Sequence, residues 1–301
     1  MILAVIIPAY NDLAGVLNAL NSLQATQARH EVSIPVHNEE LERRVDVLIP
    51  TIGRDDPLRF QPTRTEIRLT HRVMYIVQDD ASPNVFYPAL VPPAVAVTFR
   101  NEQNLGFAGN CNAGGRNVLN NVQPDVLLFL NQDVYAVPEL SQGWDTALLS
   151  AFDDPAVGIV GARLLFPDGK VQNAGGTFDQ FAQPVHRCLG WSNLDYHEIA
   201  TPREVEWTTG AALAVRASVW AELGGFDEGY ARGYFEDVDL CLRARETGHK
   251  VWYEPGCTLV HTVGTTGGSP YFVQNALRFK QQWVDSGKVK PGTLQPVSRY
   301  W

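Results

Sequence analysis

Two short segments of this sequence consist entirely of apolar residues and end abruptly. Residues 3–7 (LAVII) stop at Pro8, and residues 126–130 (VLLFL) stop at Asn131. A strand with one face in water alternates apolar and polar residues, whereas an unbroken apolar run of this length is typical of a strand covered on both faces. Such strands occur mainly in parallel sheets with helices on both sides. The two runs therefore predict an α/β fold.

The residues around these runs predict alternating helices and strands. Residues 13–23 repeat Leu and Val at helical spacing, and either Asn11 or Asp12 can cap such a helix. Two further strands and a second helix are predicted at residues 73–77, 95–99 and 108–119. This alternation is typical of a nucleotide-binding α/β sheet.

Carboxylates follow two of the predicted strands directly. Asp79 and Asp80 come after residues 73–77, and Asp133 comes after residues 126–130. Because ligands of open α/β sheets bind outside the carboxyl ends of the strands, we expect all three side chains to converge on one crevice. A carboxylate there can accept hydrogen bonds from a nucleotide or bind Mg²⁺ or Mn²⁺. The alternative is ordinary turn and loop aspartates.

More acidic residues stand at the start of a later predicted helix, in residues 235–239 (FEDVD). Glu236, Asp237 and Asp239 would crowd its first turn. The helix dipole favours carboxylates there by ~0.3–1 kcal/mol each, so a structural role is the alternative. Burial and like-charge crowding raise a carboxyl pKa, and the most buried carboxylate would be the better proton acceptor.

Two weaker signals accompany the acidic residues. Residues 104–112 (NLGFAGNCN) form a glycine-bearing loop that opens a helix, so free backbone N–H groups could face a nucleotide. The loop lacks Gly-x-Gly-x-x-Gly, and many glycine loops merely turn. His261 follows an apolar strand, where it is either a second metal ligand or an ordinary histidine with satisfied hydrogen bonds.

Composition excludes several classes of protein. The net charge of −9 argues against a nonspecific nucleic-acid binder, whose phosphate contacts require clustered Lys and Arg. The four cysteines form no Cys-x-x-Cys pair, which predicts reduced thiols in a cytoplasmic protein. No apolar run approaches the ~18–20 residues of a membrane span, so any membrane contact would be peripheral.

Seven short motifs occur in a defined order. They are residues 5–11 (VIIPAYN), 79–82 (DDAS), 104–109 (NLGFAG), 130–133 (LNQD), 209–211 (TGA), 224–227 (GGFD) and 235–240 (FEDVDL). The sequence resembles glycosyltransferase family 2 in these motifs, especially its rhamnosyltransferase-like branch. The resemblance covers most of the chain but not the polar stretch at about residues 27–72 or the end of the chain.

The resemblance implies a GT-A fold, an α/β domain with a Rossmann-like, mostly parallel sheet flanked by helices and a mixed acceptor-side half. A single domain over residues 1–301 is expected. Its parts are a nucleotide-sugar-binding half at about 1–135, an acceptor and catalytic half at about 136–268, a C-terminal helix and tail at 269–301, and an insertion at 27–72. An apolar run at residues 45–51 predicts an extra strand within the insertion.

The resemblance also implies roles for individual residues in an inverting, single-displacement reaction. Asp237 corresponds to the general base, with Glu236 beside it, and Asp133 and His261 correspond to ligands of a divalent metal, Mn²⁺ or Mg²⁺. The expected nucleotide-sugar-binding residues are Pro8, Tyr10, Asn11, Asp79, Asp80, Asn104, Gly106, Gly109 and Asn131. The expected acceptor-side residues are Trp207, Thr209, Gly210 and Asp239.

One departure from the family pattern affects the metal. Asn131 stands where the family's Asp-x-Asp motif has its first acid, so Asp133 must bind the metal alone or with His261. The implied substrates are a UDP- or dTDP-sugar donor and a saccharide acceptor, in cell-surface polysaccharide synthesis. A lipid-linked acceptor, a peripheral position at the inner face of the membrane and a homo-oligomer are all compatible with the sequence.

Two other functions are considered. A binding protein of the same fold that lacks turnover is disfavoured because every expected acid except the one at Asn131 is present. A sugar-phosphate nucleotidyltransferase would need a basic phosphate-binding loop after the first strand, and residues 8–15 contain no Lys or Arg.

Overall fold

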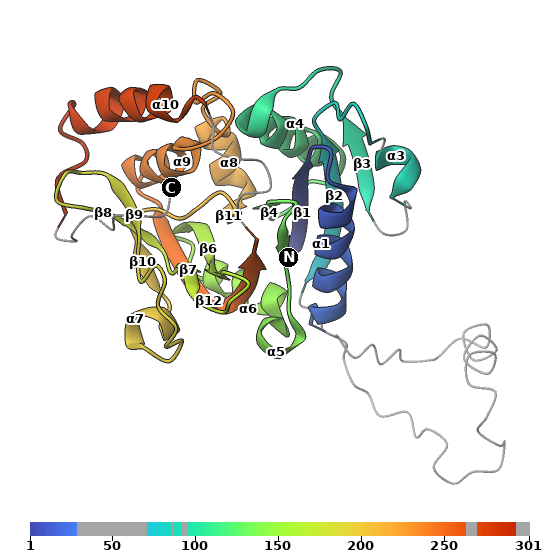
Figure 1. Cartoon of the computed structure of the whole chain (residues 1–301), viewed down its shortest axis with the longest axis horizontal. Coiled ribbons are helices and arrows are strands. Elements are labelled where there is room, and N and C mark those ends of the chain that lie inside the picture. Colours follow the sequence, from blue (N-terminus) through green and yellow to red (C-terminus); the bar gives the residue numbers. More distant parts are fainter. Residues whose placement is uncertain (29–70, 86, 92–95, 263–269, 293–301) are drawn as a thin grey trace, which may run out of the picture. The chain divides into compact units, whose positions relative to one another are not determined.

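A computed structural model describes residues 1–28, 71–85, 87–91, 96–262 and 270–292. The described elements belong to one unit made of residues 1–28 and 71–301 (Figure 1). The extra strand expected at residues 45–51, and nearly all of the expected insertion, lie outside the described residues.

The described residues form a ten-stranded sheet with the order β10-β12-β6-β11-β4-β1-β2-β3, to which β5 and β7 are added at β12 and β6. A separate pair is formed by β8 and β9. The strands are β1 (Ile2–Ala9), β2 (Arg72–Asp79), β3 (Val97–Arg100), β4 (Val126–Leu130), β5 (Val134–Tyr135), β6 (Val157–Leu165), β7 (Val171–Asn173), β8 (Gly176–Phe178), β9 (Pro184–His186), β10 (Arg203–Val205), β11 (Ala212–Arg216) and β12 (Lys250–His261).

The pairing directions divide the sheet into two halves. β1 pairs in parallel with β2 and β4, and β2 pairs in parallel with β3. β11 is inserted antiparallel between β4 and β6, after which β12 runs parallel to β6. The predicted α/β fold, with a parallel first half and a mixed second half, is confirmed.

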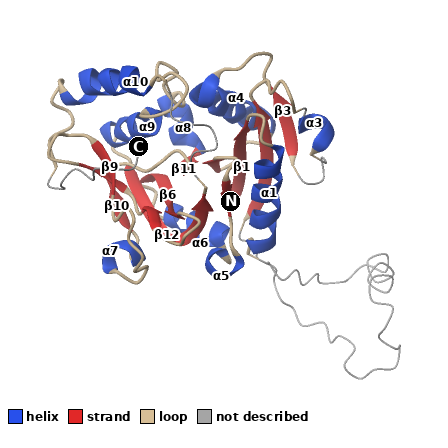
Figure 2. Cartoon of the chain, viewed as in Figure 1, coloured by secondary structure: helices blue, strands red, loops and turns tan. Residues whose placement is uncertain are grey.

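Helices cover both faces of this sheet (Figure 2). They are α1 (Leu13–Thr26), α3 (Tyr87–Leu90), α4 (Gly106–Asn121), α5 (Pro138–Ser141), α6 (Trp144–Ser150), η1 (Ala151–Asp153), α7 (His197–Ala200), α8 (Ala217–Leu223), α9 (Glu236–Glu246), α10 (Phe272–Phe279) and η2 (Lys280–Val284). Among the described residues, no helix combines the length and apolar character needed to cross a bilayer.

The first apolar run explains why both faces are covered. Successive side chains of a strand point to opposite faces, and those of β1 enter two different cores. Ala4 and Ile6 pack in the core that includes residues of α4, α8 and α9, whereas Leu3, Val5 and Ile7 pack in the core that includes α1 and α6. Burial of each Val, Leu or Ile side chain contributes about 1.5–3 kcal/mol to the stability of the fold. Exposure of either face of β1 to water would therefore destabilise the protein.

Local signals set the ends of the helices near the strand ends. Asp12, rather than Asn11, caps α1, because its Oδ1 accepts a 2.9 Å hydrogen bond from the amide of Gly15. Asn11 instead has a φ of 52° and turns the chain away from β1. Gly248, at a φ of 91°, follows the end of α9, where glycine adopts the left-handed conformation without strain.

Candidate active site

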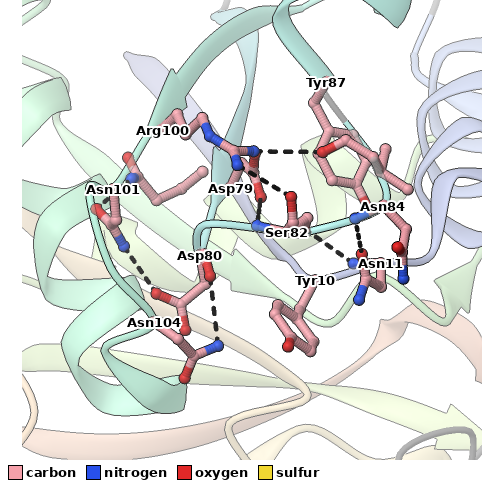
Figure 3. Close-up of polar contacts among 12 residues, drawn as sticks. Tyr10, Asn11, Asp79, Asp80, Ser82, Asn84, Tyr87, Arg100, Asn101 and Asn104 are labelled. Atoms are coloured by element: carbon pink, nitrogen blue, oxygen red, sulfur yellow. Dashed lines mark hydrogen bonds and ion pairs between the residues drawn. The ribbon is translucent and has the colours of Figure 1, made fainter.

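Side-chain hydrogen bonds tie the ends of three strands together. The amide of Tyr10, after β1, donates to Oε1 of Gln132, after β4, at 2.7 Å. The amide of Asn11 donates to Oγ of Ser82, after β2, at 2.9 Å (Figure 3). These polar contacts hold the ends of β1, β2 and β4 together, as expected. Gln132 and Ser82 take part in them, although neither is among the individually predicted site residues.

Asp79 is fully buried at the end of β2, and both of its oxygens are occupied by the protein. Oδ1 accepts a 3.0 Å hydrogen bond from the amide of Ser82, and Oδ2 pairs with the guanidinium of Arg100. Arg100 also donates to the carbonyl of Ser82 at 2.9 Å. The sequence shows no signal for this ion pair, because the two residues come from different strands.

Asp80 holds the beginning of α4. Its carboxylate accepts hydrogen bonds from the amides of Leu105 at 2.8 Å and Gly106 at 3.0 Å, and from the side chain of Asn101 at 2.9 Å. Burial raises the pKa of the Asp80 carboxyl, although these bonds oppose the shift. Residues 104–112 were expected to present free backbone N–H groups to a nucleotide. The N–H groups of Leu105 and Gly106 instead donate to the Asp80 carboxylate, which lies just after β2.

The remaining predicted donor-side residues surround this loop. Asn104 donates to the carbonyl of Asp80 at 3.3 Å (Figure 3), and the Tyr10 side chain is 42% exposed. Pro8 lies in β1 opposite Gln78. An added Cβ at Gly109 would lie 2.7 Å from Cβ of Leu105, so this glycine permits close packing within the loop.

The two predicted metal ligands meet although they lie far apart in the sequence. Nε2 of His261 is 3.1 Å from Oδ1 of Asp133, and the two side chains are 12% and 11% exposed. Pairing of β5 with β12 brings them together, since His261 is in register with Val134. Nδ1 of His261 lies 2.7 Å from Oε1 of Gln172 in β7.

The chemistry of this pair fits a divalent cation. The Gln172 oxygen can only accept, so a neutral His261 ring that donates from Nδ1 to it would present an unprotonated Nε2 beside Asp133, as a metal ligand requires. Within the described residues, no three His, Cys, Asp or Glu side chains cluster to hold a metal ion. Asp133 and His261 would therefore supply two ligands, and hard cations take further oxygen ligands from phosphate and water.

Five buried side-chain polar atoms in the described structure lack a hydrogen-bond partner, and three of them belong to residues next to the predicted metal ligands and base. These three are Oδ1 of Asn131, Nε2 of Gln172 and Oε2 of Glu236. Such atoms are uncommon in native proteins, where most buried polar groups are paired with protein or water. They are groups that a polar ligand could satisfy.

The carboxylates of Glu236 and Asp237 have different surroundings. Oδ2 of Asp237 accepts a 2.8 Å hydrogen bond from the amide of Gly210, and Oδ1 accepts one from Val238 at 2.8 Å. Asp237 is half-buried, whereas Glu236 is only 4% exposed. Burial raises the pKa of both carboxyls, but hydrogen bonds to Asp237 oppose its shift, and the pKa of Glu236 lies well above its ordinary value.

Because their surroundings differ, the two carboxyls lose their protons over different pH ranges. Two neighbouring carboxyls whose environments move their pKa values apart can divide the roles of base and acid. Asp237 is the better candidate for an ionised base, and Glu236 is the one that retains a proton.

The segment around Gly210 connects Asp237, the predicted base, to the end of β4, which precedes the predicted metal ligand Asp133. Its amide binds Asp237, and the next residue, Ala211, accepts a 2.9 Å hydrogen bond from the amide of Asn131. An added Cβ at Gly210 would approach Cβ of Asp237 to 3.3 Å. Thr209 also hydrogen-bonds Asp237 through its side chain. The predicted base and the end of β4 are thus held by adjacent residues.

A strained segment leads directly into this base. Arg232, Gly233, Tyr234 and Phe235 have φ values of 53°, 107°, 76° and 76°. A non-glycine residue in such a conformation costs on the order of 1–3 kcal/mol and persists only where its surroundings enforce it. Gly233 is the only glycine of the four, so the sequence signals little of this strain.

Two residues expected on the acceptor side make internal contacts. Asp239 is fully buried and accepts hydrogen bonds from Arg243 at 2.7 Å, Gln282 at 2.9 Å and Trp283 at 2.9 Å. Trp207 is 2% exposed, and its indole N–H donates to the protein. The first turn of α9 points Asp239 toward Arg243, one helical turn on. Its contacts are those of a residue that joins α9 to the C-terminal helix.

His186 is a further candidate residue of the active site, and the sequence gives no signal for it. Its Nδ1 lies 3.1 Å from Oδ1 of Asn173, and its ring is 4.9 Å from that of Trp207. Burial, with a smaller contribution from His261, lowers the pKa of His186 to about 4, so it is neutral at physiological pH. It lies in β9, where no motif marks it.

Known proteins resemble this chain in sequence and in fold. No protein-family model matches it. Over 233 residues it is 30% identical to the O-antigen biosynthesis protein RfbC of Myxococcus xanthus. The aligned region covers 72% of this chain and 17% of that protein. Over 158 residues it is 32% identical to N-acetylglucosaminyl-diphospho-decaprenol L-rhamnosyltransferase of Mycobacterium tuberculosis, covering 48% of this chain and 50% of that protein. The chain thus spans half or less of the length of these relatives.

The solved structure of GalNAc-T7 with UDP, GalNAc and Mn²⁺ superimposes with a TM-score of 0.62, covering 95% of this chain and 48% of that one. The sequence identity is 14%, so this likeness concerns the fold alone. The sheet, its helices and the acidic strand ends define a GT-A domain, the fold class of nucleotide-sugar glycosyltransferases. The chain belongs to glycosyltransferase family 2, in its rhamnosyltransferase-like branch.

Proposed function

We propose that this chain is an inverting glycosyltransferase that moves a sugar from a UDP- or dTDP-sugar to a hydroxyl of a saccharide acceptor. The observation that carries the proposal is the short connection between the two halves of the site. Gly210 binds the Asp237 carboxylate, and Ala211 binds the end of β4, two residues before Asp133. The proposed base and the strand end that leads to Asp133 are thereby held by two adjacent residues.

The reaction would use these residues as follows. Asp237 accepts the proton of the acceptor hydroxyl while the hydroxyl oxygen bonds to the anomeric carbon of the donor. The bond from that carbon to the diphosphate oxygen breaks, and its electron pair leaves with the nucleoside diphosphate. Attack from the face opposite the leaving group inverts the anomeric configuration.

The other residues prepare this step. Oδ1 of Asp133 and Nε2 of His261 are the atoms that would hold Mn²⁺ or Mg²⁺, which when bound supplies positive charge to the departing diphosphate. Burial raises the pKa of the Glu236 carboxyl well above its ordinary value, which favours its neutral form beside Asp237. Asp80 and Asp79 keep the donor-side loops in place.

The names of the relatives support a narrower version of the proposal. One is an O-antigen biosynthesis protein, and another is named for transfer of L-rhamnose to a saccharide on diphospho-decaprenol. We therefore favour a deoxyhexosyl donor and a lipid-linked acceptor in cell-surface polysaccharide synthesis. Exposed Val273 and Leu277, with Arg278 nearby on α10, would suit a peripheral position at the membrane.

The test is direct. The purified chain is screened by thermal shift against UDP-, dTDP- and GDP-sugars with and without Mn²⁺, since a ligand of the native state raises apparent stability. Stabilising donors are then incubated with saccharide acceptors, and release of nucleoside diphosphate is measured. Mn²⁺-dependent transfer supports the proposal. Binding without turnover would indicate a binding protein, and pyrophosphate release from a nucleoside triphosphate and a sugar phosphate would indicate a nucleotidyltransferase.

A further inference from the structure

One side chain from α10 holds the strained segment, residues 231–235, that precedes the predicted base. Oδ1 of Asn275 accepts a 3.1 Å hydrogen bond from the amide of Ala231. Its Nδ2 lies 2.7 Å from the carbonyl oxygen of Gly233, and 3.0 Å and 3.2 Å from those of Ala231 and Tyr234. Asn275 is fully buried.

The chemistry of asparagine suits this position. Successive left-handed residues cannot form the regular hydrogen bonds of a helix or strand, so buried backbone groups there need other partners. An amide side chain offers both an acceptor and two donors on one short stem. Asn275 uses both ends, and the strained backbone of residues 231–234 depends on a residue that is distant in the sequence.

The same helix also holds the side chain at the end of the segment. The ring of Phe235 lies 5.4 Å from that of Phe272 and 5.3 Å from that of Phe279, both in α10. Hydrogen bonds of Asp239 to Gln282 and Trp283 join α9 to η2, which continues directly from α10. α10 therefore contacts the segment, and η2 contacts α9, the helix into which the segment leads.

Displacement of this segment would reach both halves of the site. Phe235 is followed directly by Glu236 and Asp237, and its carbonyl accepts the hydrogen bond of the Asp239 amide at 2.9 Å. On the other side, an added Cβ at Gly106 would lie 3.3 Å from Cγ of Arg232, so the segment also packs against the start of α4.

We propose that Asn275 is a positioning residue, which sets the location of the Asp237 carboxylate by fixing the backbone of residues 231–235, of which residues 232–235 are left-handed. The inference rests on the proposed function, because it concerns the geometry of the transfer reaction. Asn275 acts through the segment and is not assigned a contact with substrate.

The experiment compares Asn275→Ala and Asn275→Asp with a matched control, Ser141→Ala. Ser141 is fully buried and also bonds the backbone in both directions, since its Oγ accepts from the amide of Val137 at 3.0 Å and donates to the carbonyl of Thr258 at 2.6 Å. Neither partner belongs to the segment or to the proposed site. Asn275→Asp keeps the acceptor for Ala231 but loses every donor. Gly233→Ala tests the conformation alone, since its φ is 107° and no heavy atom lies within 4 Å of an added Cβ.

Three measurements separate positioning from general destabilisation. Transfer gives kcat and KM, calorimetry with UDP and Mn²⁺ gives the Kd, and limited trypsin digestion reports cleavage after the exposed Arg232. We expect Asn275→Ala and Asn275→Asp to lose about 10²-fold in kcat, as small displacements of catalytic groups do. Their Kd for UDP should stay within about twofold, and cleavage at Arg232 should accelerate. Gly233→Ala should follow them, and Ser141→Ala should show neither change.

Wild-type kcat and wild-type cleavage in Asn275→Ala would overturn the inference, as would an equal loss of kcat in Ser141→Ala. The digestion distinguishes this failure from failure of the proposed function. If the wild-type chain transfers no sugar, the proposed function fails while the difference in cleavage remains.

Discussion

Nε2 of His261 lies 3.1 Å from Oδ1 of Asp133, and Nδ1 of the same ring is 2.7 Å from Oε1 of Gln172. A carboxylate from the turn between β4 and β5, an imidazole from β12 and an amide from β7 thus form one line of contacts. Gln172 fixes which nitrogen faces Asp133, and the first prediction tests this function.

We predict that Gln172→Leu weakens Mn²⁺ binding by about 10–100-fold, the usual cost of losing a partner that orients a metal-binding histidine. The fold should be retained, because the substitution also removes a buried Nε2 that has no partner in the described structure. Calorimetric titration with Mn²⁺ in the presence of UDP measures the effect. Gln183→Leu, at an exposed position, is the control. Unchanged Mn²⁺ affinity in Gln172→Leu would refute the orienting role.

Asp237→Asn is expected to lower kcat by about 10²–10⁴-fold, the usual contribution of a general base. The amide oxygen of the new side chain can still accept from Gly210, so UDP binding should persist. Steady-state kinetics with calorimetry of UDP binding provide the measurement. Asp154→Asn removes a surface carboxylate that bonds Lys250 and should leave kcat unchanged. Full activity of Asp237→Asn would exclude Asp237 as the base.

The rate of transfer should fall at acidic pH. Burial raises the pKa of the Asp237 carboxyl, and a base must be ionised to accept a proton, so activity is lost as pH falls through this raised pKa. We expect the acid limb of kcat/KM, measured at saturating Mn²⁺, to have an apparent pKa above the ordinary aspartate value of about 3.9. Circular dichroism at each pH identifies unfolding. An acid limb at or below the ordinary value would contradict the prediction.

Glu236→Gln should stabilise the folded protein at alkaline pH. In the unfolded chain Glu236 ionises near its ordinary pKa of about 4.3, whereas burial raises the folded-state pKa well above that value. Between the two pKa values the folded state binds more protons, so the free energy of unfolding falls as pH rises. Each unit of the shift is worth about 1.4 kcal/mol, and glutamine avoids this loss.

Urea unfolding at pH 5 and pH 8 measures this effect. The gain in the free energy of unfolding of Glu236→Gln over wild type should be larger at pH 8. Glu246→Gln, which removes an exposed partner of Lys288, should show no comparable pH-dependent gain. The same gain for Glu236→Gln at both pH values would show that the proton is not retained in the folded state.

Much of the architecture follows from local pattern. The apolar runs at residues 3–7 and 126–130 predict two-sided strands, and β1 and β4 are buried on both faces of one sheet. Asp12 caps α1, and the acidic cluster begins α9. These features are readable because strand burial and helix capping depend on residues only a few positions apart.

The partners of the site residues could not be predicted in the same way. Arg100 pairs with Asp79, Gln172 orients His261, and Asn275 holds the segment before Glu236. Each contact joins elements whose neighbourhood depends on strand order and on the docking of α10, and no local periodicity encodes either.

The sequence by itself therefore determined the layers of the fold and the residue types at the strand ends. Only the tertiary structure decided which carboxylate is free to act. Asp239 is paired with Arg243 and hydrogen-bonded to Trp283, Oε2 of Glu236 is buried without a hydrogen-bond donor, and Asp237 accepts a hydrogen bond from the amide of Gly210. The physical reason is that a carboxyl pKa is set by burial and by hydrogen-bond donors in space, and these arrive from distant parts of the chain.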